Sequence, residues 1–436
     1  MTPTLTVSPS NALIDVPRRI LVSGLAAGAR VLLRSRTVRG PSVVWTSSAR
    51  FLADGDGTVD LWRDAPIEGS YEGVSAMGLL WSQAPERAGA PREIFAELPA
   101  DALQTTITAS CTGASNLQAN LVQRLVADGV TRHDVREDGL VGTLFLPAPQ
   151  VRPGAPAAIL VLNGSGGGIN EPRAALYASH GYAALALGYF KAPGLSDYIS
   201  NTPLELFKNA LEWMHRTLQP SHGFVAVSGQ SRGGELALLL GAMFPDQVSA
   251  VIGYVPGAVV HSAQNACDPG LGSNSREGFA WTYEGEGLAH LWQHNRTASW
   301  APWDSGPEPR RHADALLTAL QDADAVARAH IAVERIRGPV LLLSASDDGS
   351  WPSSRYSRMV TERLAAFEHP HAVEHLDFEG AGHSIVFPYV PTTQTTYRHP
   401  VSGRLSTTGG TPAANAAADE ASWVAVLAFL RAAAPD

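Results

Sequence analysis

The sequence predicts an all-β, immunoglobulin-like sandwich followed by an α/β domain with a mostly parallel sheet. Up to about Pro99 the chain consists of short, valine-rich segments with alternating polar positions, separated by Gly, Pro and Asp turns, as in β-sandwiches. From about Ile107 apolar runs alternate with helix-compatible stretches, which indicates a parallel sheet covered by helices. The length of 436 residues, 45% of them hydrophobic, fits two domains.

We expect residues 1–105 to form the sandwich and residues 106–436 the α/β domain. Strand-like segments of the first part are "RRILVSGL", "ARVLLRSRT" and "TVDLWRDAP". The stretch 107–129 is expected to be a helix-like linker. The turn "ADGDGTVD" (53–60) has alternating carboxylates that also suggest a calcium loop, but it lacks the twelfth-position Glu and the flanking helices, which favours a hairpin turn.

The second domain begins with a hairpin-like segment, "HDVREDGLVGTLFLP", and continues with five apolar runs that look like buried strands. These runs are "AAILVLN", "AALALGYF", "GFVAVSG", "AVIGYVPG" and "PVLLLSA". The pattern is interrupted at about 261–330, which we interpret as an insertion. Four tryptophans of this insertion either line a pocket or form the core of that subregion: Trp281, Trp292, Trp300 and Trp303.

Charge and composition exclude several classes of partner. A formal net charge of −9 and the absence of a clustered basic stretch argue against nucleic acid and anionic membranes. The first twenty residues have neither a charged n-region nor a continuous apolar h-region, and the sequence has no run of roughly 18 apolar residues. We therefore expect no secretory leader and a cytoplasmic protein. Cys111 and Cys267 are too few for a disulfide framework or a thiolate metal site, and no metal or cofactor is predicted.

The stretch "GQSRG" is a G-x-S-x-G motif centred on Ser231. It follows an expected strand at 224–228 and precedes an expected helix at 234–244. In that context the motif forms the sharp turn of an α/β hydrolase, which raises the serine hydroxyl above the sheet edge. The amide of Arg232 would then point toward a developing oxyanion.

A serine nucleophile needs a base and an acid that orients the base. After "PVLLLSA" come Asp347 and Asp348, and after "AVEHLDFEG" the segment "GAGH" presents His383. The order Ser, Asp, His is that of an α/β hydrolase. We choose Asp347 as the orienting acid because it lies nearer the strand end, with Asp348 as the alternative.

A second oxyanion donor is expected in the loop Asn163–Gly168 of "ILVLNGSGGG". The Ser165 amide is our first choice, followed by Gly164 and Gly166. A phosphate-binding loop is the alternative, although the G-x-G-x-x-G spacing and the P-loop lysine are missing.

Other polar residues in the sequence have less specific patterns. His290 and His294 have the spacing of two metal ligands on one helix face, but Leu291 stands where a metalloprotease has its Glu. Glu235 lies in the first turn of the helix after Ser231. Interaction with the helix N-terminus or pairing with Arg232 explains it better than acid catalysis.

Taken together, these residues resemble the family of acyl-CoA thioesterases and bile acid-CoA:amino acid N-acyltransferases, which pairs a β-sandwich with an α/β hydrolase. The similar segments are "VSGLAAGARVLLRS", "WTSSARFLADGDGTVDL", "GSYEGVSAMGLLWS", "GLVGTLFLP", "GGGINEPRAALYASHGYAALALGYF", "GQSRGGELALLL" and "GAGHSIVFPY". The resemblance spans nearly the whole chain and places the family's triad on Ser231, Asp347 and His383.

The resemblance implies an acyl-CoA or acyl-pantetheine thioester substrate, with a carrier protein as an alternative acyl donor. Family members that conjugate amino acids typically carry cysteine as the nucleophile, whereas the hydrolases carry serine. Ser231 therefore favours hydrolysis through a serine acyl-enzyme. Two alternatives stay open: transfer of the acyl group to an amine or alcohol in a bacterial biosynthetic pathway, and an inactive, hydrolase-like binding protein.

Overall fold

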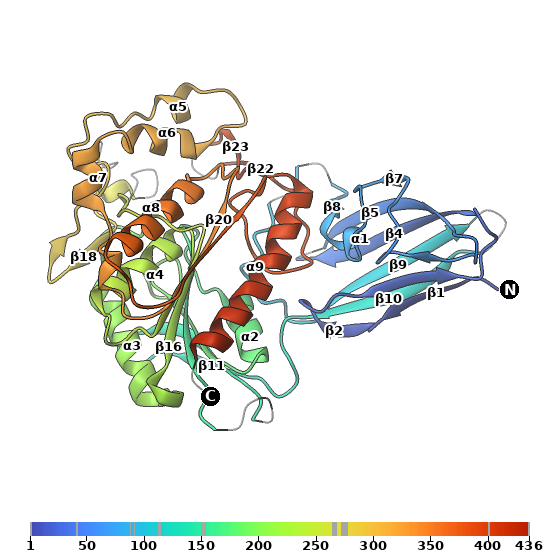
Figure 1. Cartoon of the computed structure of the whole chain (residues 1–436), viewed down its shortest axis with the longest axis horizontal. Helices are drawn as coiled ribbons and strands as arrows, with labels where there is room; N and C mark the ends of the chain where they lie inside the picture. The colour runs from blue at the N-terminus through green and yellow to red at the C-terminus, as the bar shows by residue number, and fades with distance from the viewer. Residues whose placement is uncertain are drawn as a thin grey trace. The chain divides into compact units, whose positions relative to one another are not determined.

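The computed structural model describes residues 2–434 except 41, 88, 91, 112–114, 150, 152–153, 264–267, 272–277 and 400–401. The chain divides into two compact units. Unit 1 consists of Met1–Leu125, Val386–Thr395 and Thr411–Ala421, and unit 2 of Val126–Ile385, Thr396–Gly410 and Ser422–Asp436. Figure 1 shows both units, with labels on many of their elements.

Unit 1 contains two β-sheets. The smaller has the order β1 (Thr4–Ser8), β3 (Arg19–Ser23), β6 (Val59–Asp60). The larger has the order β2 (Asn11–Leu13), β10 (Leu117–Arg124), β9 (Leu103–Cys111), β4 (Arg30–Arg39), β5 (Val43–Leu52), β7 (Glu68–Gly69), with β8 (Ala84–Pro85) also on β5 and the short helix α1 at Gly78–Trp81.

The two sheets of unit 1 share one hydrophobic core. Alternate residues of the strands are buried, as the period-2 pattern predicted, for example along β4 and β5. Ile20 and Val22 from the small sheet cluster with Val31 and Leu33 from the large one. The predicted β-sandwich is therefore confirmed.

The helix-like linker predicted at 107–129 is wrong. Its residues form most of β9 and all of β10, and β9 pairs with β4 along Val31–Thr37. Pairing with a strand distant in the sequence overrides the local helical pattern. The first unit consequently continues to Leu125 rather than ending at 105. It also includes two later segments, Val386–Thr395 and Thr411–Ala421.

The turn at 53–60, which the sequence left open between a hairpin turn and a calcium loop, is closed by contacts between Asp54 and Thr58. The turn at 53–60 is a tight one: Asp54 N–H donates to the Thr58 carbonyl at 2.9 Å, and its carboxylate accepts the Thr58 hydroxyl at 2.7 Å. These contacts fit the hairpin-turn interpretation.

Cys111 is a free, partly buried thiol, and burial raises its pKa. Cys267 lies outside the described residues.

Unit 2 is built on an eight-stranded sheet with the order β11-β12-β14-β13-β16-β17-β20-β21. Its first two strand pairs are antiparallel and the others parallel. The bounds are β11 Thr131–Val135, β12 Val141–Leu146, β13 Ala158–Leu162, β14 Ala183–Gly188, β16 Val225–Gln230, β17 Ala250–Tyr254, β20 Val340–Ala345 and β21 Val373–Phe378. The predicted hairpin and all five predicted buried strands are present.

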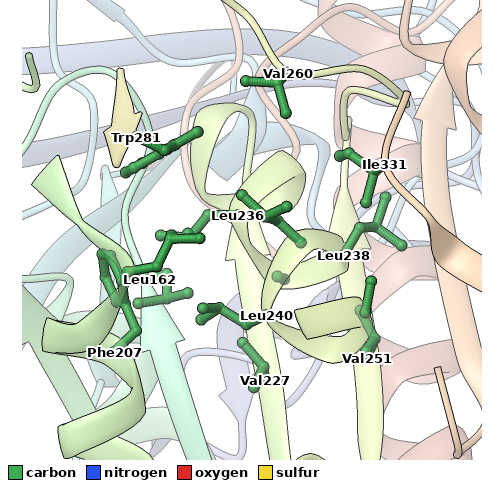
Figure 2. Close-up of a cluster of buried hydrophobic side chains, with 14 of the residues drawn as sticks. Leu162, Phe207, Val227, Leu236, Leu238, Leu240, Val251, Val260, Trp281 and Ile331 are labelled. Atoms are coloured by element: carbon green, nitrogen blue, oxygen red, sulfur yellow. The ribbon is translucent and has the colours of Figure 1, made fainter. Parts of the chain in front are cut away.

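Helices cover both faces of this sheet (Figure 1). On one face lie α2 (Glu171–Ser179) and the C-terminal part of α9 (Pro412–Ala433), where Tyr177 stacks on Trp423. On the other lie α3 (Leu204–Leu218), α4 (Arg232–Met243) and α8 (Ser353–Ala366). Figure 2 shows leucines of α4 packed between Val227 and Val251 of the sheet and residues of the inserted region. Helix α4 is thus buried on nearly all sides.

Between β17 and β20 lies the predicted insertion, with β18 (Trp281–Tyr283), β19 (Glu286–Gly287), α5 (Ala301–Ser305), α6 (His312–Ala319) and α7 (Ala323–Ala329). Short strands β15 (Thr202–Pro203), β22 (Thr396–Arg398) and β23 (Leu405–Thr407) complete the unit. The four tryptophans of the insertion pack in or against the main core. This packing favours the core interpretation for them. Over the described ranges, no helix is both long enough and apolar enough to cross a membrane.

Candidate active site

Ser231 occupies the sharp turn between β16 and α4. Its backbone angles, φ 58° and ψ −120°, are unusual for a residue with a side chain. Such a conformation costs on the order of 1–3 kcal/mol and persists only where the surroundings enforce it. Ser231 N–H donates to the Tyr254 carbonyl of β17 at 2.8 Å, which fixes the turn to the neighbouring strand.

The two motif glycines are required by close backbone contacts. A β-carbon on Gly229 would lie 1.9 Å from the Gly233 carbonyl oxygen. A β-carbon on Gly233 would lie 2.4 Å from the carbonyl oxygen of Asn163, in the loop after β13. The spacing G-x-S-x-G therefore follows from steric exclusion on both sides of the serine.

His383 connects Ser231 to an aspartate. Its Nε2 lies 2.8 Å from Ser231 Oγ, and its Nδ1 lies 2.8 Å from Asp348 Oδ2. The aspartate side chain is 1% exposed and the histidine side chain 13% exposed. Because an ionised carboxylate only accepts, Nδ1 carries the hydrogen in the neutral ring, which leaves Nε2 to accept the serine hydroxyl proton.

The choice of Asp347 as the orienting acid is wrong in geometry, and Asp348 holds the histidine. A turn joins Asp348 N–H to the Ala345 carbonyl at 3.3 Å and carries Asp348 back over the sheet edge. Asp348 Oδ1 accepts the amides of Ser350 and Trp351 at 2.8 and 3.1 Å. The Asp347 side chain is 49% exposed; it pairs with Arg311 at 3.0 Å and accepts the Gly410 amide at 2.9 Å.

The segment after β23 fixes the aspartate loop to the histidine loop. The Thr408 carbonyl accepts both Gly349 N–H and His383 N–H, each at 2.9 Å. A β-carbon on Gly382 would lie 2.2 Å from the Gly409 carbonyl, so the chain packs too closely there for any side chain. No motif of the sequence pointed to this segment, whose signal is the run "STTGGT" beyond the last large strand.

The loop after β13 lies beside the serine, as expected. A β-carbon on Gly164 would lie 3.7 Å from Ser231 Oγ. The Gly164 amide is already used, because it donates to Asn163 Oδ1 at 3.0 Å, and Gly167 N–H donates to the Gly164 carbonyl at 3.1 Å. Of the three amides considered from the sequence, Gly164 is thus unsuited to an oxyanion, whereas Ser165 and Gly166 are both exposed at the turn.

Arg232 begins α4, and its side chain enters a buried polar network. Its Nη1 lies 3.3 Å from both carboxylate oxygens of Glu235, and its Nη2 donates to the Ser262 carbonyl at 3.0 Å. Glu235 is fully buried and also accepts Trp281 Nε1–H at 2.9 Å. The pairing of Glu235 with Arg232 inferred from the sequence is confirmed.

His261 extends this network toward the aspartate loop. Its Nδ1 lies 2.7 Å from Glu235 Oε2 and its Nε2 lies 2.8 Å from Tyr356 Oη. Burial lowers the pKa of His261. Burial alone would raise the pKa of Glu235, but the nearby Arg232 and His261 have the larger combined effect, so the pKa of Glu235 is lowered. A neutral His261 donating to an ionised Glu235 satisfies both groups.

The paired histidines His290 and His294 do not lie on a helix. Residues 291–294 form a turn, and His294 has a φ of 50°. His290 is buried with its ring edge-on to Phe279 at 5.6 Å. Within the described ranges, no group of three or more His, Cys, Asp and Glu side chains is placed to hold a metal ion.

An eight-stranded, mostly parallel sheet with a serine elbow, and with a histidine and an aspartate after later strands, defines an α/β-hydrolase unit. The chain belongs to the BAAT/acyl-CoA thioester hydrolase family. Residues 202–434 match the model of the "BAAT / Acyl-CoA thioester hydrolase C terminal" region, and residues 15–137 match the "Acyl-CoA thioester hydrolase/BAAT N-terminal region".

Similar curated proteins cover almost the whole chain. Acyl-coenzyme A thioesterase 6 of Mus musculus is 30% identical over 99% of this chain and 97% of that protein. Peroxisomal succinyl-coenzyme A thioesterase of Mus musculus is 29% identical, covering 98% and 96%, and mitochondrial acyl-coenzyme A thioesterase 2 of Homo sapiens is 29% identical, covering 98% and 84%. A solved thermostable esterase is 12% identical with a TM-score of 0.36, covering 87% of this chain and 91% of that chain.

Proposed function

We propose that the protein hydrolyses acyl thioesters through a serine acyl-enzyme, with Ser231 as nucleophile, His383 as general base and Asp348 as the residue that orients His383. The observation that carries the proposal is the continuous hydrogen-bonded chain from Ser231 Oγ through His383 to Asp348, with both links at 2.8 Å. This is the arrangement that lets a neutral imidazole remove the serine proton.

In the first half-reaction Ser231 Oγ attacks the thioester carbonyl carbon while its proton moves to His383 Nε2. Asp348 stabilises the imidazolium that forms, because its carboxylate is buried against Nδ1. The tetrahedral intermediate collapses, the C–S bond breaks and the thiolate leaves. A thiolate is a good leaving group, so it needs little proton donation before the C–S bond breaks. The imidazolium then gives its Nε2 proton to the departed thiolate, which yields the free thiol and leaves His383 neutral for the second half-reaction.

In the second half-reaction a water molecule attacks the Ser231 ester and gives a proton to His383 Nε2. Collapse of the second tetrahedral intermediate breaks the ester bond, and the imidazolium returns its proton to the serine oxygen. The balance is one thioester and one water converted into one carboxylic acid and one thiol.

The oxyanion of each intermediate is assigned to the backbone amides of Arg232 and Ser165. Arg232 provides the first amide of α4, where the helix dipole favours negative charge. The Ser165 turn lies in the loop whose Gly164 approaches Ser231 closely. Removing one such donor typically lowers kcat by about 10²–10³-fold.

The proposed substrates are acyl-CoA thioesters. Curated relatives that cover nearly the whole chain are named acyl-coenzyme A thioesterases, and the family models carry the same description. A serine ester is also suited to turnover by water, since it is less reactive toward amines than a cysteine thioester.

The test combines a substrate panel with labelling of the nucleophile. Acyl-CoAs of increasing chain length are incubated with the protein and free thiol is followed, with and without amino acid acceptors, while products are identified by mass spectrometry. We expect thiol and free acid in equal amounts, and covalent labelling of Ser231 by a fluorophosphonate. Ser231→Ala should lose both signals, whereas Ser402→Ala, at an exposed turn, should keep them.

Thiol release from no acyl-CoA, by folded protein that also resists the fluorophosphonate, would refute the proposal. Conjugates formed in place of free acid would identify an acyltransferase instead.

A further inference from the structure

A single buried arginine joins several parts of the site in unit 2. Arg173 lies in α2 and is 2% exposed. Its Nη2 donates to Gln230 Oε1 and to the Ile385 carbonyl, both at 3.2 Å. Gln230 directly precedes Ser231, and Ile385 follows His383 by two residues, so one nitrogen connects the loops that carry the proposed nucleophile and base.

The same guanidinium contacts the strand that fixes the serine turn. Its central carbon lies 3.9 Å from the centre of the Tyr254 ring, a cation–π contact. The Tyr254 carbonyl accepts Ser231 N–H at 2.8 Å. The helix of Arg173 is itself capped by Asn170, just beyond the glycine loop after β13. Arg173 therefore contacts or adjoins the serine turn, the histidine loop, β17 and the glycine loop after β13.

A stable core does not by itself explain an arginine here. Nε and Nη1 of Arg173 are buried without a hydrogen-bond partner among the described residues. Burying a charged group with part of its hydrogen-bonding capacity unused is unfavourable, and an apolar side chain of similar size often fits such a position at lower cost. The arginine contributes something that an apolar side chain would not provide.

We propose that Arg173 is a positioning residue that sets the distance and angle between Ser231 Oγ and His383 Nε2. The inference rests on the serine mechanism proposed above. Without the guanidinium, Gln230 and Ile385 lose their common donor, and the two loops can separate by small displacements. Displacements of about 1 Å in a catalytic geometry lower rates by about 100-fold.

The experiment compares Arg173→Met, Arg173→Lys and the unaltered protein. The readouts are the second-order rate of fluorophosphonate labelling at Ser231, and kcat and KM for an acyl-CoA, at a temperature well below each melting point. We expect Arg173→Met to lower the labelling rate and kcat by about 10–100-fold with KM changed less than about threefold. Arg173→Lys should recover part of the loss, because an ammonium can still donate to both oxygens.

Arg39 of unit 1 offers a matched control. It is 4% exposed, lies 5.5 Å from the Phe95 ring and also has two nitrogens without partners among the described residues. Arg39→Met should lower the melting temperature and leave the labelling rate unchanged. A purely structural role for Arg173 would give the same result for Arg173→Met, and that outcome would overturn the inference.

A second variant guards against misfolding. Gln230→Met removes the acceptor of the Arg173 bond and keeps the side-chain length, so it should lower the labelling rate in the same direction with a smaller change in stability. If Arg173→Met does not fold, an unchanged rate in Gln230→Met overturns the inference. Failure of the serine mechanism is recognised separately, because the unaltered protein would then not be labelled.

Discussion

Replacing Asp348 by Asn should abolish most of the activity, although the two side chains have nearly the same shape. In the structure Asp348 Oδ1 accepts two backbone amides, and Oδ2 accepts His383 Nδ1–H. An asparagine must turn its oxygen toward the two amides, so its NH₂ group faces His383. The imidazole then has to accept at Nδ1 and carry its hydrogen on Nε2, where it can no longer take the Ser231 proton.

The size of the effect follows from the charge as well. An imidazolium and a carboxylate about 4 Å apart attract each other by about 4 kcal/mol at an effective dielectric constant of 20. That energy corresponds to about 10³-fold in rate, and the tautomer reversal adds to it. We therefore expect kcat/KM to fall by about 10³–10⁴-fold in Asp348→Asn, with the melting temperature nearly unchanged.

Asp347→Asn is the matched control, because Asp347 is the neighbouring residue and the same chemical type. Its side chain is 49% exposed and forms a surface ion pair with Arg311, a type of contact worth at most about 1 kcal/mol. It also accepts the Gly410 amide, which the oxygen of an asparagine can still do. We expect kcat/KM within about threefold of the unaltered protein. The assay is release of free thiol from an acyl-CoA under steady-state conditions. More than a tenth of the activity left in Asp348→Asn, or a 100-fold loss in Asp347→Asn, would contradict the geometry.

Three further predictions concern stability and pH. Gly233→Ala puts a methyl group 2.4 Å from the Asn163 carbonyl oxygen. It should lower the free energy of unfolding by about 1–3 kcal/mol and remove most of the fluorophosphonate labelling of Ser231. An unchanged labelling rate and melting temperature would show that the turn tolerates the methyl group. Glu235→Gln leaves the buried Arg232 charge without its partner and should lower the free energy of unfolding by about 3–5 kcal/mol, measured by urea denaturation. Burial lowers the pKa of His312 to about 4, so the folded state binds its proton less readily than the unfolded chain. Stability should therefore fall as the pH drops from about 6.5 to about 4, by up to about 3 kcal/mol, and His312→Gln should flatten that slope in pH-dependent denaturation.

Local rules were sufficient for much of the prediction. The turn at Ser231 follows from the two glycines of its motif. Neither has room for a β-carbon, because Gly229 lies against Gly233 and Gly233 lies against Asn163 after the adjacent strand. The buried strands were recognisable because strands covered by helices on both faces are continuously apolar. His383 was recognisable from its place after the last large strand.

Errors arose where distant partners decide the structure. The segment 107–129 has a helix-compatible pattern, yet it forms strands because its first part, in β9, pairs with the distant strand β4. The first unit also includes residues 386–395 and 411–421, which no local feature of the sequence connects to a β-sandwich.

The sequence by itself determined the fold class and singled out Ser231 and His383, the residues proposed as nucleophile and base, because these depend on periodicity and on steric limits that act over short stretches. Only the tertiary structure decided between Asp347 and Asp348, and only it brought Arg173 to Gln230 and Ile385. The direction of a side chain after a strand depends on the turn that follows and on the segment packed against it. Those interactions join residues far apart in the chain, so their outcome is set when the chain folds.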